Sequence, residues 1–184
     1  MDHFRFLAPV YDRLMGPPDL DHLRRHLSLP AEGWLLDVGG GTGRASLPLG
    51  GLTRGAAVCD VSPTMLRRAR RKGALAVCAP AERLPFPDRS FARVLAVDAL
   101  HHFRDAPQAV AEMTRVLALG GRIAVAEFDL ADRRVRWLAL AETLCRMRSR
   151  FYTAMEIGRM FAECGLAARI ERGRRLTTWV IADT

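Results

Sequence analysis

A cluster of glycines follows a short apolar run, and it restricts the fold more than any other feature of this chain. Leu35–Val38 has the character of the end of a strand, and four of the next five residues, Gly39–Gly43, are glycine. Glycine permits positive φ and lets a ligand lie against bare backbone. Arg44–Leu49 then has the pattern of a first helical turn, whose unpaired N–H groups suit a carboxylate, a phosphate or a ribose. The sequence therefore predicts a strand, a glycine turn and a helix that form a small-molecule site.

Two acidic residues flank this turn. Asp37 lies two residues before the first glycine, where it can accept a hydrogen bond from an ammonium group or a water. Asp60 ends a second apolar strand, Ala56–Cys59, and Ser62-Pro63 opens a helix directly after it. An acid at the end of the second strand of a βαβ nucleotide site holds the ribose hydroxyls. The alternative is that Asp60 only caps the helix that follows.

The two motifs together resemble the class I methyltransferases that use S-adenosylmethionine. The segment D-V-G-G-G-T-G at 37–43 matches the acid-x-G-x-G-x-G pattern of that family without a gap, whereas the dinucleotide pattern G-x-G-x-x-G fails at its last glycine. Residues 81–91, A-E-R-L-P-F-P-D-R-S-F, are also similar to the family, and so is R-V-L-A-L-G-G-R at 115–122. Pro80 replaces the acid that usually receives the adenine amino group, and this departure weakens the adenine contact.

The resemblance covers nearly the whole chain and implies an α/β fold. Its sheet is Rossmann-like, with seven strands in the order 3-2-1-4-5-7-6, the last strand antiparallel, and helices on both faces. A length of 184 residues suits one methyltransferase domain. We expect an amino-terminal helical lid at 1–30, a cofactor-binding half at 31–128, and acceptor-side helices with a final strand pair at 129–184.

Local signals predict the individual elements. Asp19, Ser62 and Asp105 are placed to cap helices, and Thr153 with Glu156 forms a capping box. Further strands are expected where short apolar runs lie between turn residues, with Gly120-Gly121-Arg122 as a turn before the fifth strand. The predicted helices cover 20–27, 63–72, 106–117, 132–150 and 154–164, and the later strands cover 75–78, 94–97, 123–127, 166–170 and 176–181.

The resemblance also implies which residues contact S-adenosylmethionine. Tyr11 lies in a segment similar to methyltransferases of quinone precursors, in which the tyrosine belongs to a lid. Here its hydroxyl either donates a hydrogen bond to the methionine carboxylate, or its ring anchors the helix to the core. Met65 falls where the family lays an apolar residue on adenine, although a helix methionine is equally a core residue. Glu82 or a backbone carbonyl would compensate for Pro80. The expected cofactor-binding residues are Tyr11, Asp37, Gly39, Gly40, Gly41, Asp60, Val61, Met65, Ala81, Glu82 and Val97.

The fourth strand ends at Asp98, which in this fold lies beside the sulfonium. We expect one of the next two histidines, His101 and His102, to pack structurally and the other to line the acceptor pocket. Transfer of the methyl group depends mainly on holding it in line with a nucleophile, and a base is needed only if the acceptor loses a proton. The candidates for that base are Asp98, His101, His102 and Glu127, and the catalytic residue stays unassigned with His101 as its candidate.

The expected acceptor is a small molecule, bound by the lid and residues 128–155, with Phe128, Trp137, Phe151 and Tyr152 as aromatic candidates. The net charge of +8 raises nucleic acid as an alternative. This alternative is not favoured, because the base-amino enzymes resemble one another in an acid-P-P-aromatic turn and Asp98 is followed here by Ala-Leu-His. A cofactor-binding protein without turnover is a third alternative, and a homodimer is left open.

The four cysteines, Cys59, Cys78, Cys145 and Cys164, form no C-x-x-C pair, so we expect free buried thiols and no metal site. No apolar run approaches the ~20 residues of a membrane helix. The amino terminus lacks a secretory pattern. A cytoplasmic protein without membrane insertion is therefore expected.

Overall fold

A computed structural model of the protein describes residues 12, 16–128, 150–173 and 177–184. Its strands are β1 Trp34–Val38, β2 Gly55–Asp60, β3 Leu75–Cys78, β4 Phe91–Val97, β5 Leu117–Phe128, β6 Ala168–Arg172 and β7 Thr177–Asp183. Its α-helices are α2 Leu20–His26, α3 Pro63–Arg71, α4 Ala106–Val116 and α6 Ala154–Glu163, and its 3₁₀ helices are η2 Leu47–Leu52 and η3 Leu100–His102.

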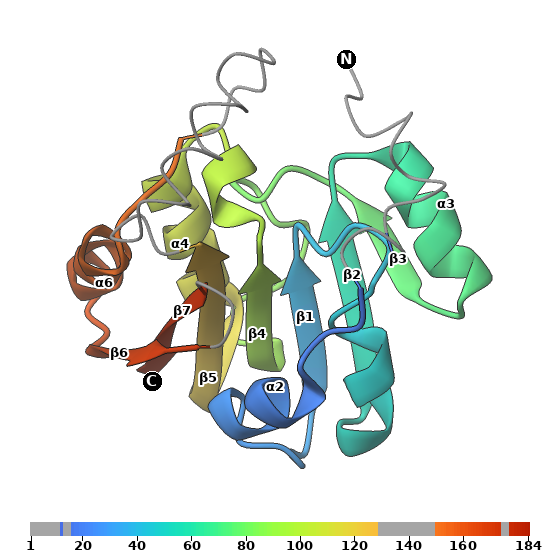
Figure 1. Cartoon of the computed structure of the whole chain (residues 1–184), viewed down its shortest axis with the longest axis horizontal. Coiled ribbons are helices and arrows are strands. Elements are labelled where there is room, and N and C mark those ends of the chain that lie inside the picture. The colour runs from blue at the N-terminus through green and yellow to red at the C-terminus, as the bar shows by residue number, and fades with distance from the viewer. Residues whose placement is uncertain (1–11, 13–15, 129–149, 174–176) are drawn as a thin grey trace.

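The seven strands form one sheet in the order β3-β2-β1-β4-β5-β7-β6 (Figure 1). Neighbours from β3 to β5 pair in parallel, whereas β7 runs antiparallel to both β5 and β6. The predicted α/β fold, strand order and antiparallel strand are therefore confirmed. The carboxyl ends of β1, β2, β4 and β5 meet along one edge, where open parallel sheets place their ligand sites.

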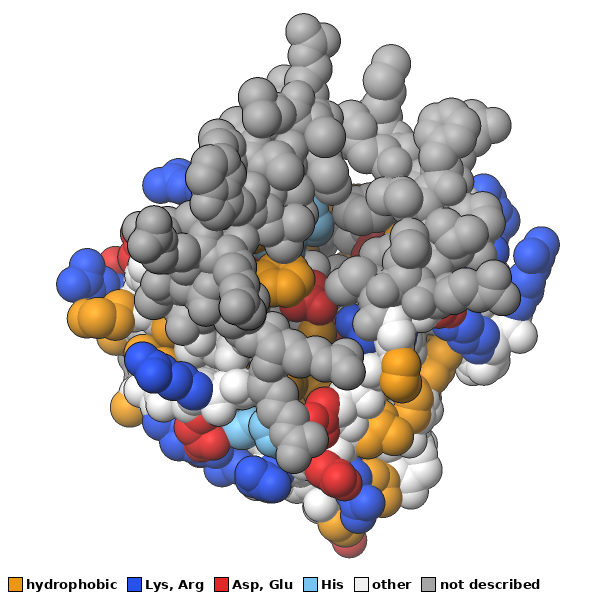
Figure 2. All heavy atoms as spheres, in the orientation of Figure 1, with side chains coloured by type: hydrophobic (Ala, Val, Ile, Leu, Met, Phe, Trp, Pro, Cys, Tyr) orange, Lys and Arg blue, Asp and Glu red, His pale blue; other side chains and the backbone are white. Residues whose placement is uncertain are grey.

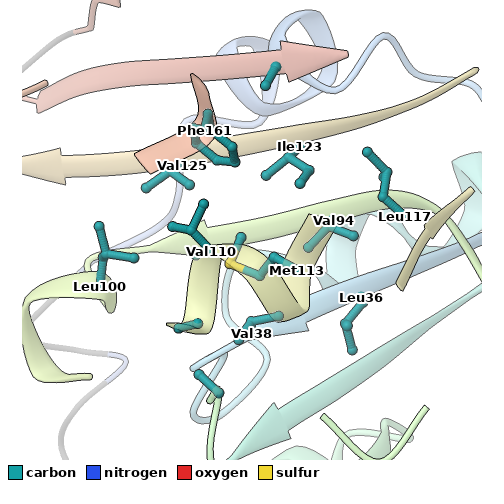
Figure 3. Close-up of a cluster of buried hydrophobic side chains, with 14 of the residues drawn as sticks. Leu36, Val38, Val94, Leu100, Val110, Met113, Leu117, Ile123, Val125 and Phe161 are labelled. Atoms are coloured by element: carbon teal, nitrogen blue, oxygen red, sulfur yellow. The ribbon is translucent and has the colours of Figure 1, made fainter. Parts of the chain in front are cut away.

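Helices cover both faces of the sheet because alternate strand residues point to opposite sides. Leu36 and Val38 belong to the larger buried cluster, which α4 and α6 complete with Val110, Met113 and Phe161 (Figure 3). Leu35 faces the other way, toward a second cluster that includes residues of α2 and η2. A third cluster packs α3 against β2.

Each α-helix begins at the polar residue that the sequence predicts. Asp19, Ser62 and Asp105 accept hydrogen bonds from the N–H groups three residues later, and Thr153 and Glu156 form the complete capping box. These side chains satisfy donors that the first helical turn leaves unpaired. The cap positions are local properties of the sequence, which is why they could be predicted.

The predicted helix at Arg44–Leu49 is wrong. Residues 41–46 form turns, and the six-residue 3₁₀ helix η2 begins only at Leu47. Pro48 lacks an N–H group and Gly50 with Gly51 disfavours continuation, so no α-helix forms. The glycine turn therefore gains no helix dipole from this segment.

Smaller differences concern element ends. β5 begins at Leu117, so Gly120-Gly121 lies within the strand, at a register shift opposite β4, and not in a turn before it. The predicted helix at 132–150 lies outside the described residues except for Arg150, which is not helical. The described part of the chain contains no helix long and apolar enough to cross a bilayer.

Candidate functional site

The turn after β1 brings bare backbone against two carboxylates. At Gly40 a Cβ atom would lie 2.4 Å from Cγ of Asp37, so a side chain there would displace a buried carboxyl group. At Gly41 a Cβ atom would make only ordinary contacts, 3.9 Å from Oδ2 of Asp60 and 4.0 Å from Cε of Met65. The φ of Gly41 is +55°, so its backbone conformation is what requires glycine.

Asp60 holds this turn from the end of β2. Its Oδ2 accepts a hydrogen bond from the N–H of Gly41 at 2.9 Å, and its Oδ1 accepts one from the N–H of Ser62 at 2.7 Å. The side chain that caps α3 is that of Ser62, which accepts from the N–H of Met65 at 3.3 Å. Asp60 is thus half-buried at the predicted place beside the glycine turn, and it is not the N-cap residue of α3.

Asp37 lies beneath the turn. It is 1% exposed, and its Oδ2 accepts a hydrogen bond from the hydroxyl of Ser46 at 2.6 Å. Its Oδ1 has no partner among the described residues. Burial raises the pKa of Asp37 to about 6, and the nearby charge of Asp60 contributes in the same direction. Asp37 therefore supports the turn from below.

The other predicted cofactor residues surround this turn to different extents. Met65 and Ala81 are buried, whereas Val61, directly after Asp60, is 64% exposed. Val97 is the last residue of β4. Tyr11 lies outside the described residues.

Glu82 has a role in holding two loops together. Its Oε1 accepts hydrogen bonds from the N–H groups of Arg104 at 2.7 Å and Asp105 at 3.1 Å. The segment after β3 is thereby tied to the start of α4. Pro80 precedes this segment and lacks a backbone donor.

A second acidic centre lies at the ends of β4 and β5. Oε1 of Glu127 accepts hydrogen bonds from the N–H groups of Ala99 at 3.0 Å and Leu100 at 2.6 Å. Its Oε2 lies 2.6 Å from Nδ1 of His101, and both side chains are buried. The His101 ring stacks on Phe151 at 4.7 Å between centroids and 7° between planes. A carboxylate at this distance favours the tautomer with a proton on Nδ1.

The second histidine differs from the first. The rings of His101 and His102 lie 4.0 Å apart between centroids. Burial lowers the pKa of His102 to about 3, and the neighbouring His101 lowers it further. His102 therefore stays neutral at physiological pH.

Asp98 and Arg44 connect the two acidic centres. Asp98 has a φ of +51°, an uncommon conformation for a residue with a side chain. Burial raises its pKa to about 6, the charge of Glu127 raises it too, and Arg44 opposes both effects. The Arg44 guanidinium lies 3.5 Å from Oδ2 of Asp98 and donates to the carbonyl of Gly16 at 3.3 Å. Arg44 thus joins the glycine turn, the end of β4 and the chain before α2.

A cavity of about 660 Å³ lies between the start of α2 and the ends of β4, β5 and β7. Its apolar wall includes Val97, Phe128 and Trp179, and its polar wall includes Arg44 and Asp98. Figure 2 views the molecule in the orientation of Figure 1 and shows acidic and apolar side chains together at the centre of this face. The remaining lining residues are Pro17, Pro18, Asp19, Leu20, Asp21, His22, Leu23, Ala126 and Thr177.

The aromatic residues expected around an acceptor are only partly brought together. Phe128 lines the cavity, whereas Phe151 stacks on His101 and Tyr152 is part of the larger buried cluster. Trp137 lies outside the described residues. The expectation did not include Trp179, because its place on β7 beside β5 depends on long-range strand pairing.

The three cysteines in the described ranges, Cys59, Cys78 and Cys164, are free thiols, and Cys145 lies outside those ranges. Cys59 is buried, and burial raises the pKa of its thiol to about 12. Cys78 is exposed because β3 is an edge strand, so the expectation of a buried thiol is wrong there. Within the described ranges, no three His, Cys, Asp or Glu residues are arranged to hold a metal ion.

Comparison with known proteins identifies relatives of this arrangement. Residues 36–125 match a family model described as a methyltransferase domain. A demethylmenaquinone methyltransferase of Thermobifida fusca is 39% identical over 163 residues, which cover 72% of this chain and 67% of that protein. The enzyme of the same name from Thermus thermophilus is 39% identical over 68% of this chain and 64% of its own length.

A solved structure shares the architecture over the full chain. This protein from Thermotoga maritima is described as an S-adenosylmethionine-dependent methyltransferase, possible histamine N-methyltransferase. The TM-score is 0.83 at 22% sequence identity, and the match covers 100% of this chain and 99% of that chain. At this identity the likeness concerns the fold alone. The chain spans 39–64% of the length of the first curated relatives that it matches.

Proposed function

Because this chain belongs to the class I S-adenosylmethionine-dependent methyltransferases, we propose that it binds S-adenosylmethionine at the turn after β1 and transfers its methyl group to a small molecule. The observation that carries this proposal is the contact of Asp60 with the N–H of Gly41 at the carboxyl ends of two adjacent parallel strands. A half-buried carboxylate beside bare backbone suits a polar nucleoside ligand.

The residues around the turn fit this cofactor. The backbone of 39–41 would hold the methionine end, and the Asp60 carboxylate would hold the ribose hydroxyls. Met65, Val61 and Ala81 would contact the adenine, with no acid at position 80 to receive its amino group. When bound, the cofactor supplies a methyl group on a sulfonium, which is already a good leaving group.

The chain itself has to position the acceptor and exclude water. We infer that the acceptor occupies the cavity of about 660 Å³, since its wall includes Arg44, which directly follows the glycine turn, and Asp98, which lies 3.5 Å from the Arg44 guanidinium. Its volume suits a small molecule, and mainly apolar pockets with few polar groups are typical of such sites. Holding the acceptor in line with the methyl carbon would lower the barrier without covalent chemistry.

The chemistry of the acceptor is proposed from the relatives and the cavity together. Two relatives are named for demethylmenaquinone and two for 2-methyl-6-phytyl-1,4-hydroquinone. Phe128 and Trp179 in the wall support a ring of this kind. If the acceptor loses a proton, Asp98 is the candidate base that lies in the cavity wall, whereas His101 is buried and is not among the lining residues.

Calorimetry tests the cofactor site directly. We expect S-adenosylmethionine and its product S-adenosylhomocysteine to bind the wild-type protein, and Asp60→Ala to weaken binding by about a hundredfold or more, since a charged hydrogen-bonding group is lost. Glu163→Ala, an exposed acid on α6, is the matched control and should bind normally. Absence of wild-type binding, or normal binding by a folded Asp60→Ala variant, would contradict the proposal.

Turnover needs a second assay with a cofactor labelled in its methyl group. We expect label to appear in a reduced naphthoquinone or benzoquinone ring supplied as acceptor. Transfer of label to tRNA or duplex DNA would contradict the small-molecule acceptor. Binding of the cofactor without transfer to either class would instead support a binding protein without turnover.

A further inference from the structure

Asp12 makes a closed set of contacts with the glycine turn that the cofactor motif does not include. Its Oδ1 accepts a hydrogen bond from the hydroxyl of Thr42 at 2.5 Å, and its Oδ2 lies 2.5 Å from Nζ of Lys72. Lys72 also donates to the backbone carbonyl of Thr42 at 3.1 Å. The three residues therefore form a ring of contacts, called here the Asp12 clamp.

The clamp joins three segments that are distant in the sequence. Thr42 is fully buried within the turn, Lys72 is the C-cap residue of α3, and Asp12 precedes the whole sheet. Lys72 is also the only lysine of the chain, among 28 basic residues. Burial raises the pKa of Asp12, but the hydrogen bonds from Lys72 and Thr42 outweigh burial and lower its pKa overall. Asp12 is thus a charged acceptor at physiological pH.

The position of Thr42 links the clamp to the proposed cofactor site. Thr42 directly follows Gly41, whose N–H is donated to Asp60. The clamp fixes both the hydroxyl and the carbonyl of Thr42, so it restricts the backbone on the carboxyl side of Gly41 while Asp60 holds the Gly41 N–H.

We propose that Asp12 is a positioning residue of the cofactor site: through Thr42 and Lys72 it holds the glycine turn in the arrangement that binds cofactor. The inference rests on the proposed function, since it assigns Asp12 to that same site. Asp12 acts through its neighbours and is given no contact with the ligand.

A purely structural ion pair would behave differently. The side chains of Asp12 and Lys72 are 35% and 38% exposed, and exposed pairs contribute little to stability. A structural pair would change the melting temperature slightly and leave ligand affinity unaltered. A positioning role requires the affinity for the cofactor product to fall even where the unliganded protein melts normally.

Calorimetry with S-adenosylhomocysteine distinguishes the two roles. We expect Asp12→Asn to weaken binding by about tenfold, because a charge-assisted acceptor of two donors is lost, and Lys72→Met to weaken it by about threefold. The double variant should bind no more weakly than Asp12→Asn alone, since the two residues act as one unit. Lys72→Arg, which retains a cation at this position, should restore most of the affinity lost in Lys72→Met.

The matched controls are Arg71→Met, which removes an exposed cation next to Lys72, and Glu163→Gln, and both should bind as wild type does.

Normal affinity in Asp12→Asn would overturn the positioning role, while wild-type binding upholds the proposed function. If Asp12→Asn fails to fold, Thr42→Val removes the same hydroxyl donor at similar volume, and normal affinity in that variant would overturn the role equally. Failure of the wild-type protein to bind would reject the proposed function itself.

Discussion

Asp60 at the end of β2 and Glu127 near the end of β5 make the same kind of contact in two halves of one sheet. Each carboxylate accepts a hydrogen bond from the loop that follows the neighbouring strand, Asp60 from Gly41 and Glu127 from Ala99 and Leu100. They differ in exposure, because Asp60 is half-buried whereas Glu127 is 5% exposed. An acidic residue at a strand end can therefore be available to a ligand or only stabilise the fold. Its exposure to solvent determines which of the two roles is open to it.

The largest expected effect is the loss of the buried acid. Glu127→Ala leaves two buried N–H groups and His101 without their acceptor, so we expect the free energy of unfolding to fall by about 3–5 kcal/mol. Asp60→Ala should cost about 1–3 kcal/mol, because its donors lie nearer to water. Urea unfolding of both variants at pH 7 measures the difference. Equal losses would contradict the contrast between the two acids.

The sequence predicts the part of the site around the glycine turn, because its residues lie close together in the chain. Gly39–Gly43 and Asp37 are neighbours in the chain, and Asp60 follows at the end of the next strand, so a motif places them. Helix caps such as Ser62 are local for the same reason. The strand order needed more than local signals, and it came from the resemblance of several separate segments to one family.

The other half depends on strand register, which no motif encodes. Val97 pairs with Ala126, and this register brings Glu127 beside the loop after β4. From the sequence, Glu127 was only one of several candidate bases, and its three hydrogen bonds could not be predicted. The Asp12 clamp was missed because it joins residues that lie 30 and 60 positions apart in the chain, and no local pattern connects them. The helix predicted after the glycine turn is an error of the other kind. There a local pattern predicted a helix that does not form, because Pro48 lacks an N–H group.

Asp37 extends the comparison to a third acid, which has fewer partners than Glu127 although it is just as buried. Its folded pKa of about 6 lies above the ordinary 3.8, so the folded state binds its proton more tightly than the unfolded state does. Stability should therefore fall as the pH rises from 3.8 to about 6, by at most about 3 kcal/mol, and stay lower above that range.

Asp37→Asn tests this pH dependence. Because asparagine does not ionise, the difference between wild type and variant should change over the same pH window, in favour of the variant at higher pH. Asp98 titrates in the same range, so only this difference isolates Asp37. Unfolding free energies at pH 4.5 and pH 7.5 provide the measurement. A difference that does not change with pH would show that Asp37 ionises normally in the folded protein.

The smallest effect belongs to the hydroxyl that supports Asp37. Ser46→Ala removes the donor to Oδ2, and the loss should be about 1–2 kcal/mol where Asp37 is ionised. Below the folded pKa the carboxyl group is neutral and the hydrogen bond from Ser46 contributes less, so the loss of stability should be smaller. In the Ser46→Ala variant the pKa of Asp37 should rise further, because the hydrogen bond that lowers it is gone. Unfolding at the same two pH values separates this effect from packing, because a cavity left by the hydroxyl would cost the same at both. A loss independent of pH would mean that Ser46 only fills space beneath the turn.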